Sequence, residues 1–399
     1  MSELSYLEKL LDGVEVEWVT LGSMADIGTG SSNRQDESEN GIYPFYVRSK
    51  NILKSDTFEF DEVAIVIPGE GGIGDIFHYV EGKYALHQRA YRIRITTNAV
   101  DTKFLYYFMS SSFKQYILTK SVGATAISIR KPMLEGFKVP IPSPDNPEKS
   151  LAIQSEIVRI LDTFTALTAE LTAELNMRKK QYNYYRDQLL SFKEGEVEWK
   201  TLEEVLVDKF WIMPATPKFD DNGEIPYITS KNISGGNIDF ERVKHISRDD
   251  FLSISKNRPI LKGDFLISMI GTIGEIARVK CLDPDFYGQN MYLIRLNEEL
   301  LHPRYFLHFF DSPRMKFYFK SVKNNSGQGY LKANNIDGLS IPLPSIDEQQ
   351  KIAFILDKFD TLTNSITEGL PREIELRQKQ YEYYRDLLFS FPKPEAVSK

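Results

Sequence analysis

The segment Arg178–Phe192, RKKQYNYYRDQLLSF, recurs 199 positions later as Arg377–Phe391, RQKQYEYYRDLLFSF. A second pair of stretches repeats in the same order, since IPGEGGIGDI at Ile67 matches ISMIGTIGEI at Ile267. Such self-similarity is the mark of a duplicated architecture. Because the matches keep one order over nearly the whole length, the sequence predicts two similar modules in tandem.

Each half changes character along its length. Residues 14–143 and 196–344 contain short β-branched and aromatic runs broken by Gly, Pro, Asn and Asp, which is typical of sheet-rich structure. One helical stretch is expected inside each module, FLYYFMSSSFKQYI in the first and YFLHFFDSPRMKFYF in the second. The modules end in the proline-rich runs VPIPSP at Val139 and IPLPSI at Ile341. A capping box, Ser345 to Glu348, then predicts the start of a long helix.

The two long helices carry coiled-coil spacing. In the first helix apolar residues recur in steps of three and four from Ile153 onward, a heptad pattern interrupted by a four-residue stutter. The stutter is the tandem repeat TAEL-TAEL, marked by Thr168, Leu171, Thr172 and Leu175. Two copies of the pattern favour pairing of the helices with each other, although a helix packed on any core would show a similar stripe. Gly369 and Pro371 predict a break in the second helix.

Composition excludes several classes of protein. The 399 residues are 42% hydrophobic and 26% charged, which is ordinary for a globular protein, and no apolar run approaches the length of a membrane helix. The N-terminus has acidic residues and no apolar run, so we expect no signal peptide. The single cysteine, Cys281, fits a reducing cytoplasm. The net charge of −7 lies on the N-terminus and the helices, and both modules are close to neutral.

The chain shows no convincing catalytic motif. PGEGGIG, from Pro68 to Gly74, lacks the Lys-Ser/Thr of a phosphate-binding loop and predicts a tight turn between strands. Asp75 followed by Glu81 and Lys83 superficially resembles a metal-dependent nuclease core, but the second half has no matching Glu-x-Lys. The five histidines form no metal-binding spacing. We therefore expect no catalytic residue, no metal site and no enzyme activity in the chain itself.

Binding residues are better represented. A Ser-Lys-Asn triplet follows a Pro-aromatic run in each module, a glutamine precedes a later strand, and polar loops precede each proline-rich exit. Such side chains suit DNA, since Lys, Arg and Ser contact phosphates while Asn, Gln and Arg can contact base edges; the alternative is ordinary turn chemistry. The candidate DNA-binding residues are Arg34, Arg48, Ser49, Lys50, Asn51, Gln88, Arg89, Thr125, Arg130, Lys131, Ser230, Lys231, Asn232, Thr272, Gln289, Asn290, Lys323, Asn324, Asn325, Gln328, Tyr330 and Lys332.

Two variable sheet-rich modules, each closed by an xPxP exit and a long helix, together with the TAEL tandem and the QYxYYRD repeat, resemble the specificity subunit of type I restriction-modification enzymes, most closely the type IC group. The resemblance covers essentially the whole chain. It implies an α+β fold, with two tandem target recognition domains separated by two long antiparallel coiled-coil helices in pseudo-two-fold arrangement. The domains it implies are 1–145 and 193–345, and the spacer helices are 146–192 and 346–399, the last with a tail.

The resemblance also implies a division of labour. Each domain would read one half of a bipartite, asymmetric sequence in double-stranded DNA, and the helices would set the spacer and dock two modification (M) subunits. Methylation of adenine with S-adenosylmethionine belongs to those subunits, and cleavage with ATP and Mg belongs to separate restriction (R) subunits. The chain would be a non-catalytic, cytoplasmic bacterial subunit without a membrane partner and without a cofactor of its own.

Two other functions stay open on the sequence alone. One is a nuclease or fused restriction enzyme, which the missing catalytic motifs disfavour. The other is a protein-interaction scaffold or inhibitor, derived from such a subunit, whose modules no longer contact DNA. A last expectation concerns Tyr6–Leu11, YLEKLL, which echoes the ends of both long helices and is predicted to pack near the C-terminal helix end, although a generic amphipathic helix would look similar.

Overall fold

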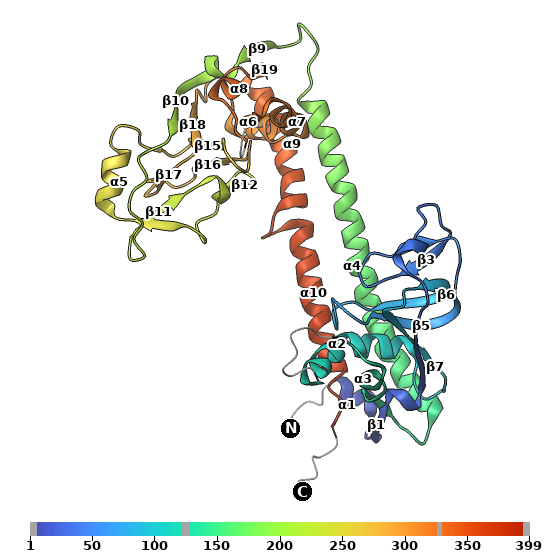
Figure 1. Cartoon of the computed structure of the whole chain (residues 1–399). Helices are drawn as coiled ribbons and strands as arrows, with labels where there is room; N and C mark the ends of the chain where they lie inside the picture. The colour runs from blue at the N-terminus through green and yellow to red at the C-terminus, as the bar shows by residue number, and fades with distance from the viewer. Residues whose placement is uncertain (1–5, 121–127, 325–328, 394–399) are drawn as a thin grey trace. The chain divides into compact units, whose positions relative to one another are not determined.

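A computed structural model describes residues 6–120, 128–324 and 329–393 (Figure 1). The chain divides into two compact units: unit 1 contains residues 1–171 and 374–399, and unit 2 contains residues 172–373. Each unit therefore combines one sheet-rich module with a portion of a helix from each half of the sequence.

Unit 1 is built on a six-stranded sheet with the order β2-β7-β5-β6-β3-β4. Neighbouring strands run antiparallel except β3 and β6, which pair in parallel. Helix α2 (Thr102–Lys120) lies against β5 and β6 (Figure 1). The strands are β2 (Ala25–Thr29), β3 (Tyr43–Tyr46), β4 (Leu53–Ser55), β5 (Phe60–Pro68), β6 (His78–Leu86) and β7 (Ala90–Ile95).

The entry and the exit of the first module meet in a separate ribbon. Strand β1 (Val16–Thr20) pairs antiparallel with β8 (Lys138–Pro142), which places Trp18 opposite Pro140. A short helix α3 (Lys131–Glu135) precedes β8. The proline-rich exit is thus a paired strand, and it leads into the long helix α4 (Pro147–Leu189).

The N-terminal helix α1 (Tyr6–Leu11) packs at the C-terminal helix end, as the sequence predicts. Its Leu7 and Leu11 belong to the same buried cluster as Leu388 and Phe389. Next to this cluster the Trp18 indole donates a hydrogen bond to the carbonyl oxygen of Pro392 at 2.8 Å. The N-terminal helix and the C-terminal end of the last helix therefore contribute to the same core in unit 1.

Unit 2 repeats this plan with a more divided sheet. A four-stranded antiparallel sheet has the order β10-β18-β15-β16, and a three-stranded sheet has the order β14-β11-β17. Two ribbons, β12-β13 and β19-β9, complete the unit. The strands are β9 (Glu198–Thr201), β10 (Leu206–Ile212), β11 (Ile225–Ile228), β12 (Ile233–Ser234), β13 (Asn237–Ile238), β14 (Lys244–Ile246), β15 (Phe265–Ser268), β16 (Ile276–Arg278), β17 (Tyr287–Gly288), β18 (Met291–Leu296) and β19 (Ser340–Leu343).

The prediction of one helical stretch holds for α2 but is wrong for the second module. There the stretch is split into α6 (Pro303–Phe310) and α7 (Pro313–Val322). Ser312 caps α7, since its hydroxyl accepts a hydrogen bond from the Met315 amide, and Pro313 has no amide hydrogen with which to continue α6. Two further short helices of this unit are α5 (Arg248–Ser255) and α8 (Ala333–Asp337).

The helix after the second module is broken where the sequence predicts it. Helix α9 (Ile346–Asn364) starts at the Ser345 cap, whose hydroxyl accepts a hydrogen bond from the Glu348 amide. Helix α10 (Gly369–Leu388) begins at Gly369, where φ is +79° and a Cβ atom would collide with the Thr361 carbonyl oxygen. Pro371 occupies the first turn of α10, where its missing amide hydrogen costs nothing.

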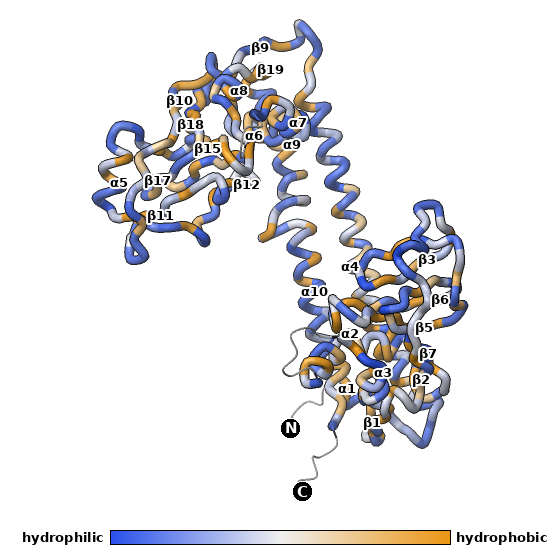
Figure 2. Tube along the Cα trace, viewed as in Figure 1, coloured by the Kyte–Doolittle hydropathy of each residue, from blue (hydrophilic) through white to orange (hydrophobic). Residues whose placement is uncertain are grey.

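Helix α4 runs without a break through the TAEL repeat and contributes to both units. In unit 1 its Phe164 stacks on Tyr384 of α10, and in unit 2 its Tyr185 stacks on Phe359 of α9. Figure 2 shows why these helices need partners, because hydrophobic positions recur along otherwise hydrophilic tubes. The predicted helix–helix pairing is therefore present within each unit.

Candidate nucleic-acid interface

A glycine-rich turn joins β5 to β6 in unit 1 and organises the predicted loops around it. Gly71, Gly72 and Gly74 have positive φ values, as the predicted tight turn requires. The Glu70 carboxylate accepts hydrogen bonds from Arg48 at 3.0 Å and from Arg89 at 3.2 Å. Two arginines that are far apart in the sequence thus bind the same carboxylate, that of Glu70.

The loop before α3 joins the same turn through its backbone. Glu70 forms an isolated bridge with Ser128, and the Ile129 amide donates to the Gly69 carbonyl oxygen at 2.8 Å. Arg130 and Lys131 come directly after Ile129 and are exposed. This contact brings the exit loop of the module beside the two anchored arginines.

The Ser-Lys-Asn triplet and Gln88 are fixed by neighbouring polar contacts. The Ser49 hydroxyl donates to the Asn51 carbonyl oxygen at 3.1 Å, and the His78 ring nitrogen lies 3.3 Å from the Ser49 carbonyl oxygen. Burial lowers the pKa of His78, so its ring adds no charge at neutral pH. The Gln88 side chain donates to Asn33, beside the predicted Arg34, at 2.6 Å.

Several of these cations remain available to a ligand. Lys50 and Arg130 are exposed and make no ion pair within the part of the chain that the structure describes. Arg34 pairs with Glu37 at 3.3 Å and Lys131 with Glu135 at 3.8 Å, both at the surface. Surface pairs of this kind contribute ~0–1 kcal/mol, so a phosphate can displace them.

The equivalent turn of unit 2 joins β15 to β16 and repeats the arrangement. The Leu331 amide donates to the Met269 carbonyl oxygen at 2.9 Å, as Ile129 does to Gly69. Tyr330 forms an isolated bridge with Ile270, and its hydroxyl accepts a hydrogen bond from the Asn324 side chain at 3.0 Å. The exit loop again meets the turn.

The triplet of unit 2 reaches the same turn. The Thr272 hydroxyl donates to the Ser230 carbonyl oxygen at 2.8 Å, and Ser230 begins a short 3-10 helix that ends at Asn232. The side chain of Gln289 accepts hydrogen bonds from Thr216 at 3.1 Å and Tyr227 at 3.4 Å. Asn290, with φ of +62°, follows Gln289 and directly precedes β18, as Arg89 follows Gln88 and directly precedes β7.

A groove of about 620 Å³ lies beside these residues. Of the predicted residues it contains Ser230, Lys231, Asn232, Thr272 and Asn290. Two basic residues that also line it, Arg242 and Lys244, were not predicted from the sequence. Lys244 belongs to β14, whose pairing with β11 brings it here, and no local pattern around it predicts that pairing. Aromatic rings line the groove as well, and the Lys244 ammonium lies 4.2 Å from the centre of the Phe219 ring.

One predicted DNA contact has to be corrected. Asn232 is 6% exposed, and its side-chain oxygen accepts from the amide and hydroxyl of Thr229 at 3.0 and 3.1 Å. Its amide nitrogen donates to the Arg242 carbonyl oxygen at 3.3 Å. Because these bonds occupy both ends of the carboxamide, Asn232 shapes the loop and is not retained as a DNA-binding residue.

The remaining predicted residues fall into two groups. Lys323 and Lys332 flank the exit loop of unit 2, where Lys323 is partly exposed and Lys332 is exposed before α8. Thr125, Asn325 and Gln328 lie outside the described residues.

The nuclease-like Asp75 is ion-paired with Lys114 at 2.7 Å. Within the described ranges no cluster of three or more His, Cys, Asp or Glu side chains is placed to hold a metal, and no helix has the length and apolar character to span a membrane.

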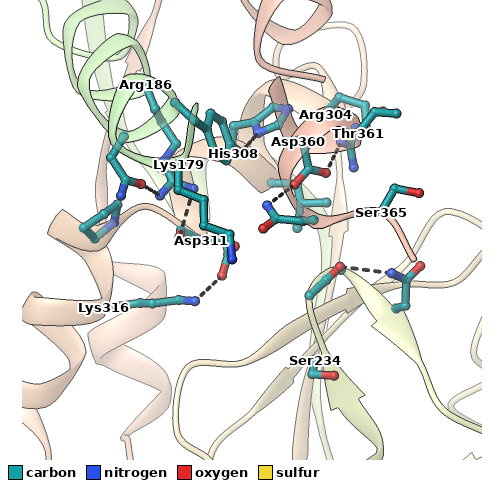
Figure 3. Close-up of a pocket in the computed structure, with 18 of the residues that line it drawn as sticks. Lys179, Arg186, Ser234, Arg304, His308, Asp311, Lys316, Asp360, Thr361 and Ser365 are labelled. Carbon is teal, nitrogen blue, oxygen red and sulfur yellow. Dashed lines mark hydrogen bonds and ion pairs between the residues drawn. The ribbon is translucent and has the colours of Figure 1, made fainter. Parts of the chain in front are cut away.

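A second cavity of unit 2, about 1260 Å³ in volume, lies where the module meets the helices (Figure 3). Its acidic residues are already engaged, because Asp311 pairs with Lys316 at 2.8 Å and Asp360 with Arg304 at 3.5 Å. The cationic side chains that line it are Lys179, Arg186, Lys280, Arg304, Lys316 and Lys320. This cavity is therefore lined by more cationic side chains than the groove beside the β15–β16 turn.

Comparison with known proteins identifies the family of the chain. The model of the type I restriction modification DNA specificity domain matches residues 13–178 and again 195–376. The EcoR124I/EcoR124II specificity subunit of Escherichia coli is 41% identical, with 100% of both chains covered. The EcoprrI specificity subunit of Escherichia coli is 36% identical over 92% of this chain and 93% of the relative.

A solved structure has the same fold. The S subunit of a type I restriction-modification system from M. genitalium aligns with a TM-score of 0.59 and 17% identity, covering 96% of this chain and 98% of that chain. The sequence prediction of an α+β fold with two recognition modules and long helices is confirmed. The chain belongs to the family of type I restriction-modification DNA specificity subunits, and it is a non-catalytic subunit with two tandem specificity domains.

Proposed function

We propose that each module contacts one half of a bipartite DNA sequence through the loops gathered at its β5–β6 or β15–β16 turn. The observation that supports this most strongly is the repetition of the arrangement. In both modules a backbone bond fastens the exit loop to the turn, through Ile129 in one and Leu331 in the other. The polar triplets lie next to the same turns. Different side chains around a similarly fastened turn are what two domains with different target sequences need.

The side chains at the turns suit distinct parts of the duplex. Arg48, Arg89 and Gln88 have the planar donor groups that make bidentate contacts to base edges in the major groove. Lys50, Arg130 and Lys231 are exposed and suit phosphates, which position the protein without carrying sequence information. We therefore assign base contacts to the anchored residues and phosphate contacts to the exposed lysines and arginines around them.

The proposal includes the partners of the complex. Two modification subunits would transfer methyl groups from S-adenosylmethionine to adenine, and restriction subunits would use ATP and Mg. The functional segments would be the recognition domains 1–145 and 193–345 and the spacer helices 146–192 and 346–399. A location in the bacterial cytoplasm accords with this role, because the DNA to be recognised lies there.

The charge distribution supports a need for partners in tight DNA binding. Residues 20–140 carry 14 basic and 13 acidic side chains, and residues 200–344 carry 19 and 18. Neutralisation of phosphates supplies most non-specific DNA affinity. Near-neutral modules should therefore bind the duplex weakly on their own, and tight binding should require the modification subunits. Nanomolar binding by the isolated chain would contradict this part of the proposal.

A module-specific substitution tests the assignment. The full chain is co-expressed with its modification subunits, and methylated adenines are mapped across the genome. Arg89→Ala should relax the sequence of only one half-site, and Thr272→Ala should affect only the other. Lys351→Ala, an exposed substitution on α9, serves as the control. A change in both half-sites, or in neither, would contradict the assignment of one turn to each half-site.

A further inference from the structure

In each unit one aspartate of a long helix binds the recognition module. The two aspartates, Asp162 and Asp357, occupy equivalent positions in the two halves of the sequence. In unit 1 the Asp162 carboxylate of α4 accepts a hydrogen bond from the Tyr107 hydroxyl at 2.6 Å and another from the Lys103 ammonium at 2.7 Å. Both donors are on α2, four residues apart and therefore on one face of it. The contact joins the recognition module directly to the spacer helix.

Unit 2 builds the same joint from different donors. Asp357 of α9 accepts hydrogen bonds from Arg304 at 2.8 Å and from His308 at 2.6 Å, and both donors lie four residues apart on α6. The acids occupy matching positions, since ILDTFTALT surrounds Asp162 and ILDKFDTLT surrounds Asp357. The duplication has therefore kept the acid and changed its partners from Lys and Tyr to Arg and His.

His308 also connects the joint to a second helix. Its Nδ1 atom lies 3.0 Å from the Tyr182 hydroxyl oxygen of α4. Because the Asp357 carboxylate can only accept, Nε2 of His308 carries the hydrogen of that bond, and in the neutral ring Nδ1 accepts from Tyr182. His308 is 3% exposed, and Figure 3 shows it beside Arg186 in the basic cavity. One carboxylate thus ties α6 to α9 and, through the imidazole, to α4.

A buried glutamine forms a second fastening eight residues earlier on each helix. Gln154 accepts from the Asp101 amide at 2.8 Å and donates to the Ala99 carbonyl oxygen at 3.0 Å. Gln349 accepts from the His302 amide at 2.8 Å and donates to the Leu300 carbonyl oxygen at 3.0 Å. Gln154 is 0% exposed and Gln349 is 1% exposed. Each glutamine therefore holds the loop that leads into the helix bearing the acid's partners.

Two separate contacts fix the orientation of a module on its helix, whereas a single contact would allow the module to rotate about it. Eight residues correspond to about 12 Å along an α-helix. A module held at two points that far apart cannot swivel about either of them without breaking a buried or charge-assisted hydrogen bond. The orientation of each module on its helix is thus built into its own unit.

We propose that Asp162 and Asp357 are positioning residues that hold each recognition module at a fixed angle on its helix, and that they thereby restrict the chain to one spacer length between the half-sites. This inference rests on the proposed bipartite recognition. The residues touch no DNA base in the proposal, and they act through the rigidity of the joint. Loss of either aspartate contact should widen the range of spacer lengths that the complex accepts and leave the half-site sequences unchanged.

The test uses the full chain co-expressed with its modification subunits and genome-wide mapping of methylated adenines. Asp357→Asn should raise methylation at targets whose spacer is one base pair longer or shorter by roughly tenfold, the size expected when one charge-assisted hydrogen bond is removed. Tyr107→Phe, which removes a single hydroxyl from the other joint, should act in the same direction and keeps the packing of the ring.

The other copy of the joint supplies a matched control. Arg304→Lys combined with His308→Tyr installs the donors of unit 1 in unit 2 and should keep the wild-type spacer, whereas Arg304→Ala combined with His308→Ala should not. A merely structural role would lower the yield of the complex and leave the spacer distribution unchanged. An unchanged spacer in Asp357→Asn and in Tyr107→Phe would overturn the inference. Absence of any bipartite motif for the wild-type chain would instead overturn the proposed function.

Discussion

The phenol ring of Tyr384 stacks on the phenyl ring of Phe164, with ring centres 5.4 Å apart and planes inclined by 24°. The same contact occurs in unit 2, where Tyr185 stacks on Phe359 at 5.5 Å and 27°. The tyrosines belong to the two copies of the QYxYYRD motif. The motif that reveals the duplication is therefore also the motif that pairs the helices.

Removal of this stacking should weaken each helix pair. A double-mutant cycle of Phe164→Ala and Tyr384→Ala should give a coupling free energy of about 1 kcal/mol, because aromatic pairs contribute ~0.5–1.5 kcal/mol beyond the area they bury. The cycle of Phe359→Ala and Tyr185→Ala should give a similar value. Urea unfolding of the purified complex measures both. A coupling near zero in either cycle would show that the stacked geometry has no energetic role.

The TAEL repeat should control the spacer. Deletion of Thr172–Leu175 removes four residues from α4, which shortens the helix by about 6 Å and rotates its C-terminal part by roughly 40°. One base pair advances the duplex by about 3.4 Å. We expect the deletion to change the spacer length and to leave both half-sites unchanged. Methylome sequencing of the deletion variant measures this, and an unchanged spacer would refute the prediction.

The exit loop of unit 2 should contact phosphates. Replacement of Lys323 and Lys332 by Ala should weaken binding of the assembled complex to any duplex and make the dependence on salt shallower, by about one unit of slope for each phosphate that is no longer neutralised. Fluorescence anisotropy at several salt concentrations measures both quantities. If affinity and slope stay as in the wild type, the loop makes no phosphate contact, and the hypothesis of a protein-interaction scaffold gains support.

The joint at Asp357 should make unit 2 sensitive to acid. Burial alone would raise the pKa of Asp357, but hydrogen bonds from His308 and Arg304 outweigh it and hold the pKa at about 2. A carboxylate with a lowered pKa in the folded state stabilises that state above the unfolded pKa of about 3.9, and this stabilisation is lost as the pH falls toward 2.

Substitution of Asp357 should therefore make the free energy of unfolding fall less steeply as the pH is lowered. Asp357→Asn should lose stability at pH 7 relative to the wild type, and the difference should shrink as the pH falls below 4. Chemical unfolding monitored between pH 2.5 and 7 tests this. The Glu241→Gln variant, at an exposed position elsewhere in the same unit, is the control. A difference that stays constant with pH would contradict the assigned ion pair.

The sequence predicts the parts of this fold that depend on local pattern. The duplication, the capped start of α9 at Ser345 and the break at Gly369 can be inferred from residues that lie next to each other in the chain. The split between α6 and α7 was missed, although Ser312 and Pro313 are a local stop and start, because the apolar pattern continues across them.

The site was harder to predict because it depends on contacts between distant segments. Arg48 and Arg89 were identified by residue type, but their shared anchor, Glu70, depends on the register of three strands. Lys244 reaches the groove only through the pairing of β14 with β11. Asn232 was predicted to contact DNA because the Ser-Lys-Asn triplet gives no sign that its side chain is buried.

Recognition of one half-site by each module is tested most directly by the methylome of cells that express this chain with its modification subunits. We expect one bipartite motif, with two unrelated half-sites separated by a spacer of fixed length. Exchange of residues 14–143 for those of another family member should replace one half-site and keep the other. Methylation at a single continuous motif, or at no motif at all, would contradict the claim that each module recognises its own half of the target.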